Sequence, residues 1–298
     1  MNLAMIRLLR PKQWTKGAVV LAAPIFSNRF LEGSDLLKIF LALVSISAMS
    51  SCAYVFNDFI DQDRDRAHPV KKFRPIASGE ISKNQAIVTG ILLAIIAFSA
   101  ISSVGRSATL LIILYAVLQI LYNLWLKDIP VTDVFIVSIG YVIRAMLGAA
   151  AVVVPISGWL LFCTGALALL VGFGKRRAEF VLNQGSHAIT REVLTGYTRE
   201  VLDIFLVLSA AGAAMSYGIY SLISDTAHKH PALILTSIWV LYAIYRYVYL
   251  VVAKNEGGEP ESLFLKDPHL IASIILFLIF AIAALKGFQI HLVEVPRI

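Results

Sequence analysis

Charged residues are scarce in this sequence, at 15% of its 298 residues. Soluble domains carry about 25% charged residues, so the composition excludes an ordinary soluble globular protein. Cysteine is rarer still. Cys52 and Cys163 both lie in apolar runs, which is typical of small membrane-core residues and not of a disulfide or a metal site. Residues 1–16 are basic but lack an apolar core followed by a small-residue cleavage site, so we expect no cleaved signal peptide.

Hydrophobic residues make up 58% of the chain, and the mean hydropathy is +0.78. They form continuous runs long enough to cross about 30 Å of hydrocarbon as helix, and not the ten-residue alternation of a membrane β-barrel. The pattern predicts an all-α integral membrane protein with about nine transmembrane helices. The predicted spans are residues 17–30 (short, with Pro24), 36–56, 84–104, 108–124, 132–152, 157–174, 200–221, 231–252 and 269–285.

Most of the 26 basic residues fall in the N-terminal segment and in the loops on its side of the predicted bundle. The positive-inside rule therefore predicts a cytoplasmic N-terminus and a C-terminus outside. The long polar loops, after the second, sixth and eighth spans, also lie on that side. We expect a multi-pass protein of the cell inner (plasma) membrane whose active site faces the cytoplasm. The net charge of +7 then reflects topology and membrane lipids with anionic headgroups, and no nucleic-acid partner is expected.

Three carboxylates follow the second predicted span at helical spacing. Asp58, Asp61 and Asp65 stand at i, i+3 and i+7, so their side chains share one face of a helix, with Asn57 beside that face. Carboxylates crowded on one face repel one another unless a cation is present. Oxygen ligands at this spacing favour Mg²⁺, which prefers a few carboxylates together with substrate phosphates. Asp63 points off this face and is left out of the predicted metal ligands.

Basic residues follow on a loop bounded by prolines. Lys71, Lys72 and Arg74 are placed to meet phosphate oxygens, which arginine can bind bidentately. The alternative is a solvated stretch at the membrane surface, in which Asp63 pairs with Arg66 and the lysines meet lipid headgroups. His68, before Pro69, is expected to be a turn or capping residue and not a ligand.

At these residues the sequence resembles the UbiA superfamily of intramembrane prenyltransferases, whose first signature is Asn-Asp-x-x-Asp-x-x-x-Asp. Asn57, Asp58, Asp61 and Asp65 match it position for position. Residues 10–16, ending in Lys16, resemble the family's N-terminal approach. Tyr122 with Lys127 resembles the family's middle helices, and so do residues 140–144, which end in Arg144. The resemblance implies one catalytic transmembrane domain over residues 1–298.

Most members of the superfamily carry a second aspartate-rich motif after the sixth helix, and this chain departs from that pattern. It has Lys175, Arg176, Arg177 and Glu179 there. This resembles the branch of decaprenyl-phosphate phosphoribosyltransferases, as do residues 68–77, Tyr197 and residues 257–261. The alternatives are that the bases form a positive-inside stop signal and that Glu179 pairs with Lys175.

The branch resemblance implies a reaction in which phosphoribose passes from phosphoribosyl pyrophosphate to a polyprenyl phosphate. It also implies Mg²⁺ at the three aspartates and a homo-oligomer. Lys175 and Arg177 are then expected to hold the acceptor phosphate or the 5-phosphate, with Arg176 contributing charge. Glu179 is expected to orient them or to contact ribose hydroxyls. Both substrates are anionic, so such a site needs many cations.

Two other functions stay open at this point. A conventional prenyltransferase would move a polyprenyl group from its diphosphate to an aromatic acceptor. A non-enzymatic transporter would show midplane charges and internal symmetry, whereas most charge here lies at one membrane face. Arg144 lies within a predicted span, where a charge usually faces the bundle interior or a cavity. Arg144 and Asp133 could instead be boundary residues of one helix.

Overall fold

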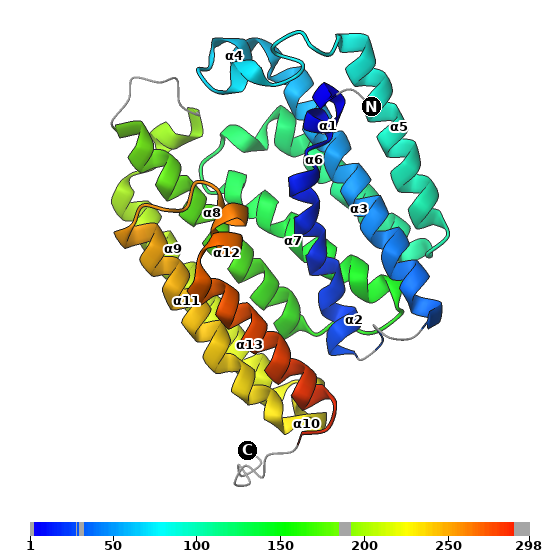
Figure 1. Cartoon of the computed structure of the whole chain (residues 1–298), viewed down its shortest axis with the longest axis vertical. Coiled ribbons are helices and arrows are strands. Elements are labelled where there is room, and N and C mark those ends of the chain that lie inside the picture. Colours follow the sequence, from blue (N-terminus) through cyan, green and yellow to red (C-terminus); the bar gives the residue numbers. More distant parts are fainter. Residues whose placement is uncertain (1–2, 28, 30–32, 185–191, 289–298) are drawn as a thin grey trace. The chain divides into compact units, whose positions relative to one another are not determined.

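The computed structural model describes residues 3–27, 29, 33–184 and 192–288, and within them all regular structure is helical (Figure 1). Backbone polar groups in lipid must be satisfied within their own segment, which a helix achieves. By its contacts the chain divides into two compact units, residues 1–155 with 183–197, and residues 156–182 with 198–298. The prediction of one domain over residues 1–298 stays a prediction.

Among the described residues, eight helices are long and apolar enough to cross a membrane. This confirms the prediction of an all-α, multi-pass membrane protein. The candidate spans are Asp35–Ile60, Lys83–Ser102, Arg106–Leu124, Thr132–Ala151, Gly158–Asn183, Arg199–Ile223, Pro231–Ala253 and Pro268–Leu285. They correspond to the second to ninth predicted spans. The orientation of the termini stays a prediction, and residues 289–298 lie outside the described part of the chain.

The first predicted span, residues 17–30, does not form one continuous α-helix. The chain there runs as a 3₁₀ helix, η1 (Pro11–Leu21), followed by a short α-helix, α2 (Ala22–Phe26). Pro24 contributes to the difference, because it lies inside this segment and has no backbone N–H to donate to the carbonyl of residue 20. Residues 28 and 30 of that span lie outside the described residues.

The first unit is built around one long helix, α3 (Gly33–Ile60), which packs along α5 (Lys83–Ser102) and also contacts η1, α6 (Arg106–Leu124) and α7 (Thr132–Ala151) (Figure 1). A buried cluster that includes Ile46, Ile112 and Leu147 joins these helices. Gly148 lets η1 approach closely, since a Cβ at this position would lie 1.9 Å from the carbonyl oxygen of Val20. The unit's short elements are α1 (Leu3–Leu9), α4 (Gln62–Ala67), η2 (Lys71–Phe73), η3 (Leu126–Asp128) and η4 (Glu192–Gly196).

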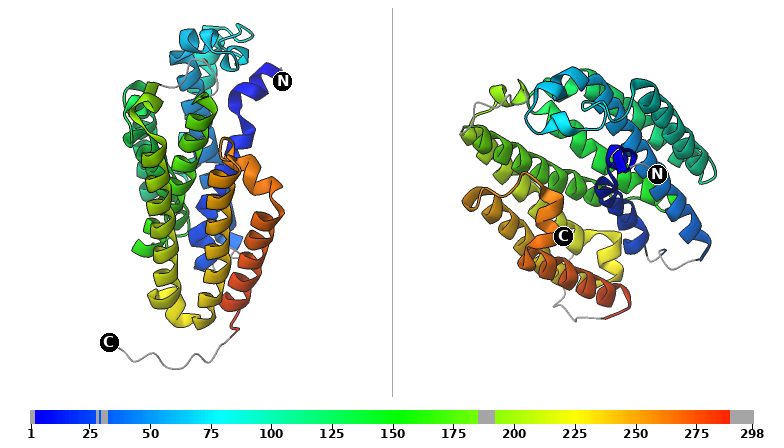
Figure 2. Two further views of the ribbon diagram at one scale, coloured as in Figure 1. Left: turned by 90° about the vertical axis from the view of Figure 1, so that its left-hand side faces the viewer. Right: turned by 45° about the horizontal axis from the view of Figure 1, so that its top comes forward.

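The second unit packs α11 (Thr236–Ala253) against α9 (Arg199–Ile223) on one side and α13 (Pro268–Leu285) on the other (Figure 2). Its core cluster includes Leu170 of α8 (Gly158–Gln184), Leu206 and Val251. The remaining elements are α10 (Asp225–Lys229), η5 (Pro231–Leu235) and α12 (Pro260–Lys266).

The loop that follows α4 is held in a defined conformation before α5 begins. Ser82 and Gln85 form a reciprocal capping box at the start of α5, with Ser82 N donating to Gln85 Oε1 over 3.0 Å. Upstream, Gln62 donates to the Ile76 carbonyl over 3.2 Å, and the backbone amide of Ser78 donates to the Arg74 carbonyl. These bonds return the loop to the C-terminal end of α3, where the acidic residues lie.

Candidate active site

The three predicted metal-ligand residues lie at the junction of α3 and α4. Helix α3 ends at Ile60, and Asp61 is the residue before α4. The helical hydrogen bonds nevertheless continue through the junction, because Asp61 N donates to the Asn57 carbonyl over 2.9 Å and Asp65 N donates to the Asp61 carbonyl over 2.8 Å. Asp58, Asp61 and Asp65 therefore keep the succession of helical turns that their spacing predicts, although two assigned helices share it.

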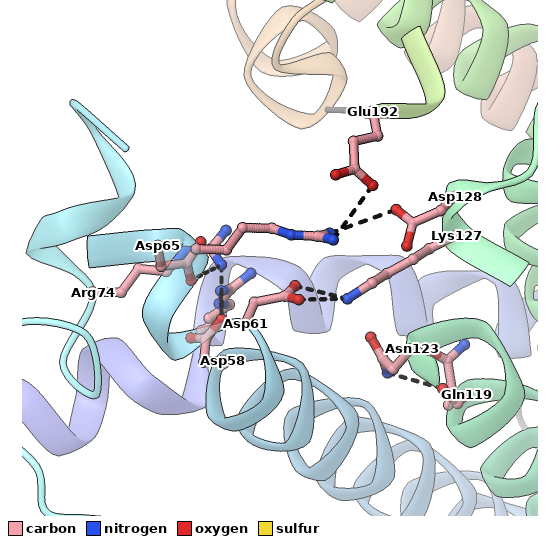
Figure 3. Close-up of polar contacts among 11 residues, drawn as sticks. Asp58, Asp61, Asp65, Arg74, Gln119, Asn123, Lys127, Asp128 and Glu192 are labelled. Carbon is pink, nitrogen blue, oxygen red and sulfur yellow. Dashed lines mark hydrogen bonds and ion pairs between the residues drawn. The ribbon is translucent and has the colours of Figure 1, made fainter. Parts of the chain in front are cut away.

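Two arginines from different segments meet at Asp58. Arg10, which precedes η1, donates to Asp58 Oδ1 over 2.6 Å, and Arg74 donates to the same oxygen over 3.0 Å. Arg74 Nη1 also donates to Asp65 Oδ2 over 2.7 Å, so one guanidinium nitrogen bridges two carboxylates (Figure 3). The side chain of Asp58 is 2% exposed and that of Asp65 is 4% exposed. Such buried carboxylates need a cation or hydrogen-bond donors to remain charged.

The third carboxylate pairs with a residue far away in sequence. Lys127 of η3 places Nζ 2.7 Å from Asp61 Oδ1 and 2.8 Å from Oδ2 (Figure 3). Its side chain is 11% exposed. The cluster of Asp58, Asp61 and Asp65 with Arg10, Arg74 and Lys127, called the aspartate–cation cluster below, thus joins four segments of the first unit.

Asp65 lies in α4, beyond the candidate span, and two opposing effects act on its pKa. Burial raises the pKa of the Asp65 carboxyl above its ordinary value, and the nearby Arg74 guanidinium opposes that rise. The opposition shows what the cations do in this cluster: without them, carboxylates in a poorly solvated position would take up protons.

Arg10 is a member of the cluster that the residue patterns did not predict. It adopts a left-handed backbone conformation (φ 50°, ψ 58°), which is unusual for a residue other than glycine. Its guanidinium lies 4.7 Å from the centre of the Tyr54 ring. The sequence signal for Arg10 is its position at the start of residues 10–16, which resemble the family's N-terminal approach. The residue predicted to bind substrate in that stretch is Lys16. Lys16 lies half-buried on η1.

The loop after α4 places the other predicted residues around the cluster. His68 Nδ1 accepts from the backbone amides of Val70 and Lys71 over 3.1 and 3.2 Å, which confirms its predicted role in a turn. Burial and the charge of Lys71 lower the pKa of His68, so it remains a neutral acceptor. Lys71 is half-buried, and Lys72 is exposed with its ammonium 5.2 Å from the Phe73 ring.

Asp63 and Asn57 lie beside the cluster. Asp63 is exposed and pairs with Arg66 over 3.3 Å, as the alternative interpretation of this segment expected. The Asn57 side chain is half-buried next to Asp58. Arg64 lies 3.4 Å from Glu192 and 3.7 Å from Asp128, all on exposed side chains (Figure 3).

The donor set of the cluster fits magnesium in its chemistry, because it offers carboxylate oxygens and neither sulfur nor imidazole. Within the described residues, however, no group of three acidic, histidine or cysteine side chains is arranged to surround a single ion. Each of the three carboxylates is instead engaged by a basic side chain. Asp58, Asp61 and Asp65 could hold the ion once those basic side chains turn away.

Arg144 lies deep in the first unit, on α7, and is 6% exposed. It donates to the Gly140 carbonyl over 2.8 Å, to Ser50 Oγ over 3.0 Å and to the Tyr115 hydroxyl over 2.9 Å. The rings of Tyr115 and Tyr141 lie 4.9 and 5.3 Å from its guanidinium carbon. Arg144 is therefore an interior residue and not a boundary residue at the helix end.

Tyr197 and Tyr122 are the other predicted residues of the first unit. Tyr197 is buried, donates to Asp133 Oδ1 over 2.8 Å and accepts from the backbone amide of Val131. Val131 precedes α7 and has φ 70°, so Tyr197 anchors the start of that helix. Tyr122 is half-buried near the end of α6, five residues before Lys127.

In the second unit the three consecutive basic residues 175–177 of α8 lie in different environments. Arg176 is 5% exposed and donates to Glu179 over 2.8 Å. Arg177 is fully buried. It donates to Asp203 Oδ1 over 2.5 Å, to the Val251 carbonyl over 2.7 Å and to Asn255 over 3.1 Å. Its position ties α8 to α9 and α11. Lys175 is half-buried.

The model of the UbiA prenyltransferase family matches residues 18–177. The chain belongs to this family. Two relatives similar over most of their length are the decaprenyl-phosphate phosphoribosyltransferases of Mycolicibacterium smegmatis and Corynebacterium glutamicum. They are 35% and 33% identical, over 88% and 89% of this chain and 86% and 82% of their own. The resemblance noted in the sequence is thereby confirmed.

Solved structures of UbiA homologues share the fold. The homologue from Archaeoglobus fulgidus, solved bound to GPP and Mg²⁺, superposes with a TM-score of 0.73 at 18% identity, covering 95% of this chain and 99% of its own. A homologue from Aeropyrum pernix, solved in the apo form, gives a TM-score of 0.58 at 13% identity. At such identities the likeness shows the UbiA fold alone.

Proposed function

We propose that this UbiA family member transfers 5-phosphoribose from phosphoribosyl pyrophosphate to a polyprenyl phosphate of the decaprenyl type, releasing diphosphate. The observation that carries the proposal is the aspartate–cation cluster, where Arg10, Arg74 and Lys127 contact the three carboxylates within 3.0 Å. Relatives named decaprenyl-phosphate phosphoribosyltransferase, 32–35% identical over most of the chain, supply the substrate class.

Asp58, Asp61 and Asp65 would hold Mg²⁺, which supplies charge neutralisation for a departing diphosphate. In this chain Arg74 and Lys127 are already at the carboxylates and are long enough to bind phosphate oxygens beside them. Arg74 can do so through two N–H groups. Lys71 and Lys72 would add charge at the loop, and Asn57 would orient an aspartate or a phosphate.

The bond between the anomeric carbon and the diphosphate oxygen breaks, and the diphosphate leaves with the electron pair. An oxygen of the lipid phosphate forms the new bond to the anomeric carbon from the opposite face. Because that phosphate is ionised near neutral pH, no protein base has to remove a proton. The protein contributes position and electrostatic stabilisation, which are large terms in such reactions.

Several further roles are proposals for predicted residues outside the aspartate–cation cluster. Arg144 and Tyr122 would bind substrate within the membrane portion of the first unit. Lys16 would bind substrate from η1. In the second unit, Lys175 and Arg176 would bind a substrate phosphate, with Glu179 orienting Arg176. The burial of Arg177 and of Tyr197 favours a positioning role for both. A homo-oligomer stays a prediction.

A conventional prenyl transfer to an aromatic acceptor is the second candidate, because the matching family model is that of prenyltransferases. One experiment separates the two. Purified protein with Mg²⁺ is given phosphoribosyl pyrophosphate and polyprenyl phosphate, or prenyl diphosphate and hydroxybenzoate. We expect the first pair alone to be consumed. Consumption of the second pair alone would replace the proposal with the second candidate.

The multi-pass membrane location is supported by the eight candidate spans. We propose further that the membrane is the inner (plasma) membrane and that the cluster faces the cytoplasm, because basic residues gather on that side. A Lys72→Cys protein in right-side-out vesicles should resist an impermeant maleimide until the vesicles are opened. Lys229→Cys should react at once. The reverse pattern would invert the proposed topology.

A further inference from the structure

We infer that Arg10, Arg74 and Lys127 block the metal-binding carboxylates in the ligand-free protein and release them to a divalent ion only when a diphosphate is present. Metal and diphosphate then bind with strong positive cooperativity. This inference rests on the proposed function, because it takes Asp58, Asp61 and Asp65 as the metal ligands. It adds Arg10 to the binding machinery.

All three carboxylates are engaged by basic side chains in this structure. Lys127 spans both oxygens of Asp61 at 2.7 and 2.8 Å. Arg10 and Arg74 converge on one oxygen of Asp58, and Arg74 also reaches Asp65. A metal ion seeking three carboxylate ligands must first displace at least Lys127 and Arg74.

The charges of the cluster nearly cancel as it stands, with three carboxylates facing three basic side chains. A bare divalent ion would add two positive charges beside them. Asp58 and Asp65 are almost fully buried, so water screens the added charge poorly. A metal ion that is already bound to a diphosphate brings its own negative charge. Its arrival leaves the cluster close to neutral, and the displaced cations acquire new partners.

The same basic side chains bind the diphosphate once it has entered the cluster with the metal. Freed from the aspartates, the Lys127 ammonium and the Arg10 and Arg74 guanidinium groups can bind the phosphate oxygens that enter with the metal. Arg10 starts from a left-handed backbone conformation and lies over the ring of Tyr54, which holds its guanidinium at the cluster. Each cation has a partner in both states, and none is left buried and unpaired.

The test measures binding without turnover. Mn²⁺ replaces Mg²⁺, and electron paramagnetic resonance reports the free ion as it is titrated into detergent-solubilised protein, with and without methylene diphosphonate as a diphosphate that is not hydrolysed. We expect the diphosphonate to tighten Mn²⁺ binding to the protein by on the order of tenfold to a hundredfold after correction for the complex formed in solution. Linkage requires that Mn²⁺ tighten diphosphonate binding by the same factor.

Charge-removing variants show whether the basic residues cause the coupling. Lys127→Met should bind Mn²⁺ alone roughly tenfold more tightly than the wild type and lose most of the coupling. Arg10→Gln should change in the same direction. Matched controls remove one exposed charge elsewhere in the unit. Arg64→Gln is the control for Lys127→Met, because Arg64 pairs with Asp128, the neighbour of Lys127. Arg7→Gln is the control for Arg10→Gln, because Arg7 lies on the preceding helix and pairs with Glu80. Both controls should match the wild type.

Tight Mn²⁺ binding by the wild type without diphosphonate would overturn the inference, and so would unchanged Mn²⁺ affinity in both Lys127→Met and Arg10→Gln. The wild-type titration decides even if one variant fails to fold. Failure of the proposed function is a separate result, since it would appear as cooperative binding of Mn²⁺ and diphosphonate by a protein that makes no phosphoribosyl lipid.

Discussion

Lys127 and Asp61 form a two-point ion pair, with the lysine Nζ 2.7 and 2.8 Å from the two carboxylate oxygens. Lys127 belongs to η3, after α6, and Asp61 lies at the end of α3. The pair therefore fixes the segment after α6 to the acidic end of α3 within the first unit. It also places a positive charge where the proposed metal and diphosphate would bind.

Removing the charge of Asp61 should abolish most of the transfer activity. In Asp61→Asn the amide cannot hold the metal or balance Lys127, and loss of one electrostatic contact of this kind lowers turnover by about 10²–10³-fold. Asp63→Asn is the matched control, because Asp63 carries the same charge two residues away but is 93% exposed. The measurement is turnover with labelled phosphoribosyl pyrophosphate. Near wild-type turnover in Asp61→Asn would remove this cluster from the mechanism.

Arg177 and Lys175, two residues apart, should fail in different ways. Arg177→Met removes a fully buried guanidinium and leaves Asp203 and the Val251 carbonyl without this donor. The free energy of unfolding should therefore fall by about 2 kcal/mol or more. Lys175→Met should keep the wild-type melting temperature and raise KM for a phosphate-bearing substrate. Thermal unfolding in detergent and steady-state kinetics distinguish them. A direct role for Arg177 in binding would be indicated by lost turnover at an unchanged melting temperature.

Gly148→Ala should destabilise the first unit strongly. A Cβ at position 148 would lie 1.9 Å from the Val20 carbonyl oxygen, so η1 would have to move away from α7. Overpacking of this kind costs about 1–3 kcal/mol or more. At Gly90 the nearest atom, on Val55, would lie 3.9 Å from an added Cβ, and Gly90→Ala should be neutral or slightly stabilising. Equal melting temperatures for the two variants would contradict the close contact.

Asp267 should make stability depend on acid pH. The hydrogen bond from Arg246, 2.7 Å away, lowers the pKa of the Asp267 carboxyl below its ordinary value of 3.8. Its stabilisation is therefore fully present above pH 3.8 and is lost as the pH falls through the lowered pKa. Asp267→Asn can still cap α13 at Leu270 but lacks the charge.

The melting temperature of the wild type should exceed that of Asp267→Asn at neutral pH, and the difference should shrink as the pH falls below 3.8. The difference should be small, because one partner is partly solvated and water screens the ion pair. A difference that stays constant down to the acid unfolding limit would show that the ion pair contributes nothing.

Residue patterns predicted the parts of the molecule that short-range rules govern. Apolar runs of about 20 residues predicted eight of the spans, because the thickness of the hydrocarbon fixes the helix length. The first predicted span differs in that it is not one continuous α-helix, and Pro24 within it removes a helical hydrogen bond, an effect that run length alone does not register. The spacing of Asp58, Asp61 and Asp65 predicted their succession on one helical path.

The partners of those aspartates could not be predicted by spacing. Arg10 and Lys127 reach the cluster from segments 48 and 66 residues away in sequence. Only tertiary packing, of η1 against α3 and of η3 against α6 and α7, brings them there. The burial of Arg177 could not be predicted by spacing either. Three bases in succession suggested one phosphate site, but α8 rotates successive side chains by about 100°, and Arg177 faces the core of its unit while Arg176 pairs with Glu179.

The origin of the oxygen that joins sugar and lipid tests the central claim most directly. Purified protein is given Mg²⁺, phosphoribosyl pyrophosphate and a polyprenyl phosphate whose phosphate oxygens carry ¹⁸O, and the products are weighed by mass spectrometry. The account predicts a phosphoribosyl lipid that retains all of the label and a released diphosphate that carries none. Label in the released phosphate product, with the prenyl chain moved to another acceptor, would contradict it.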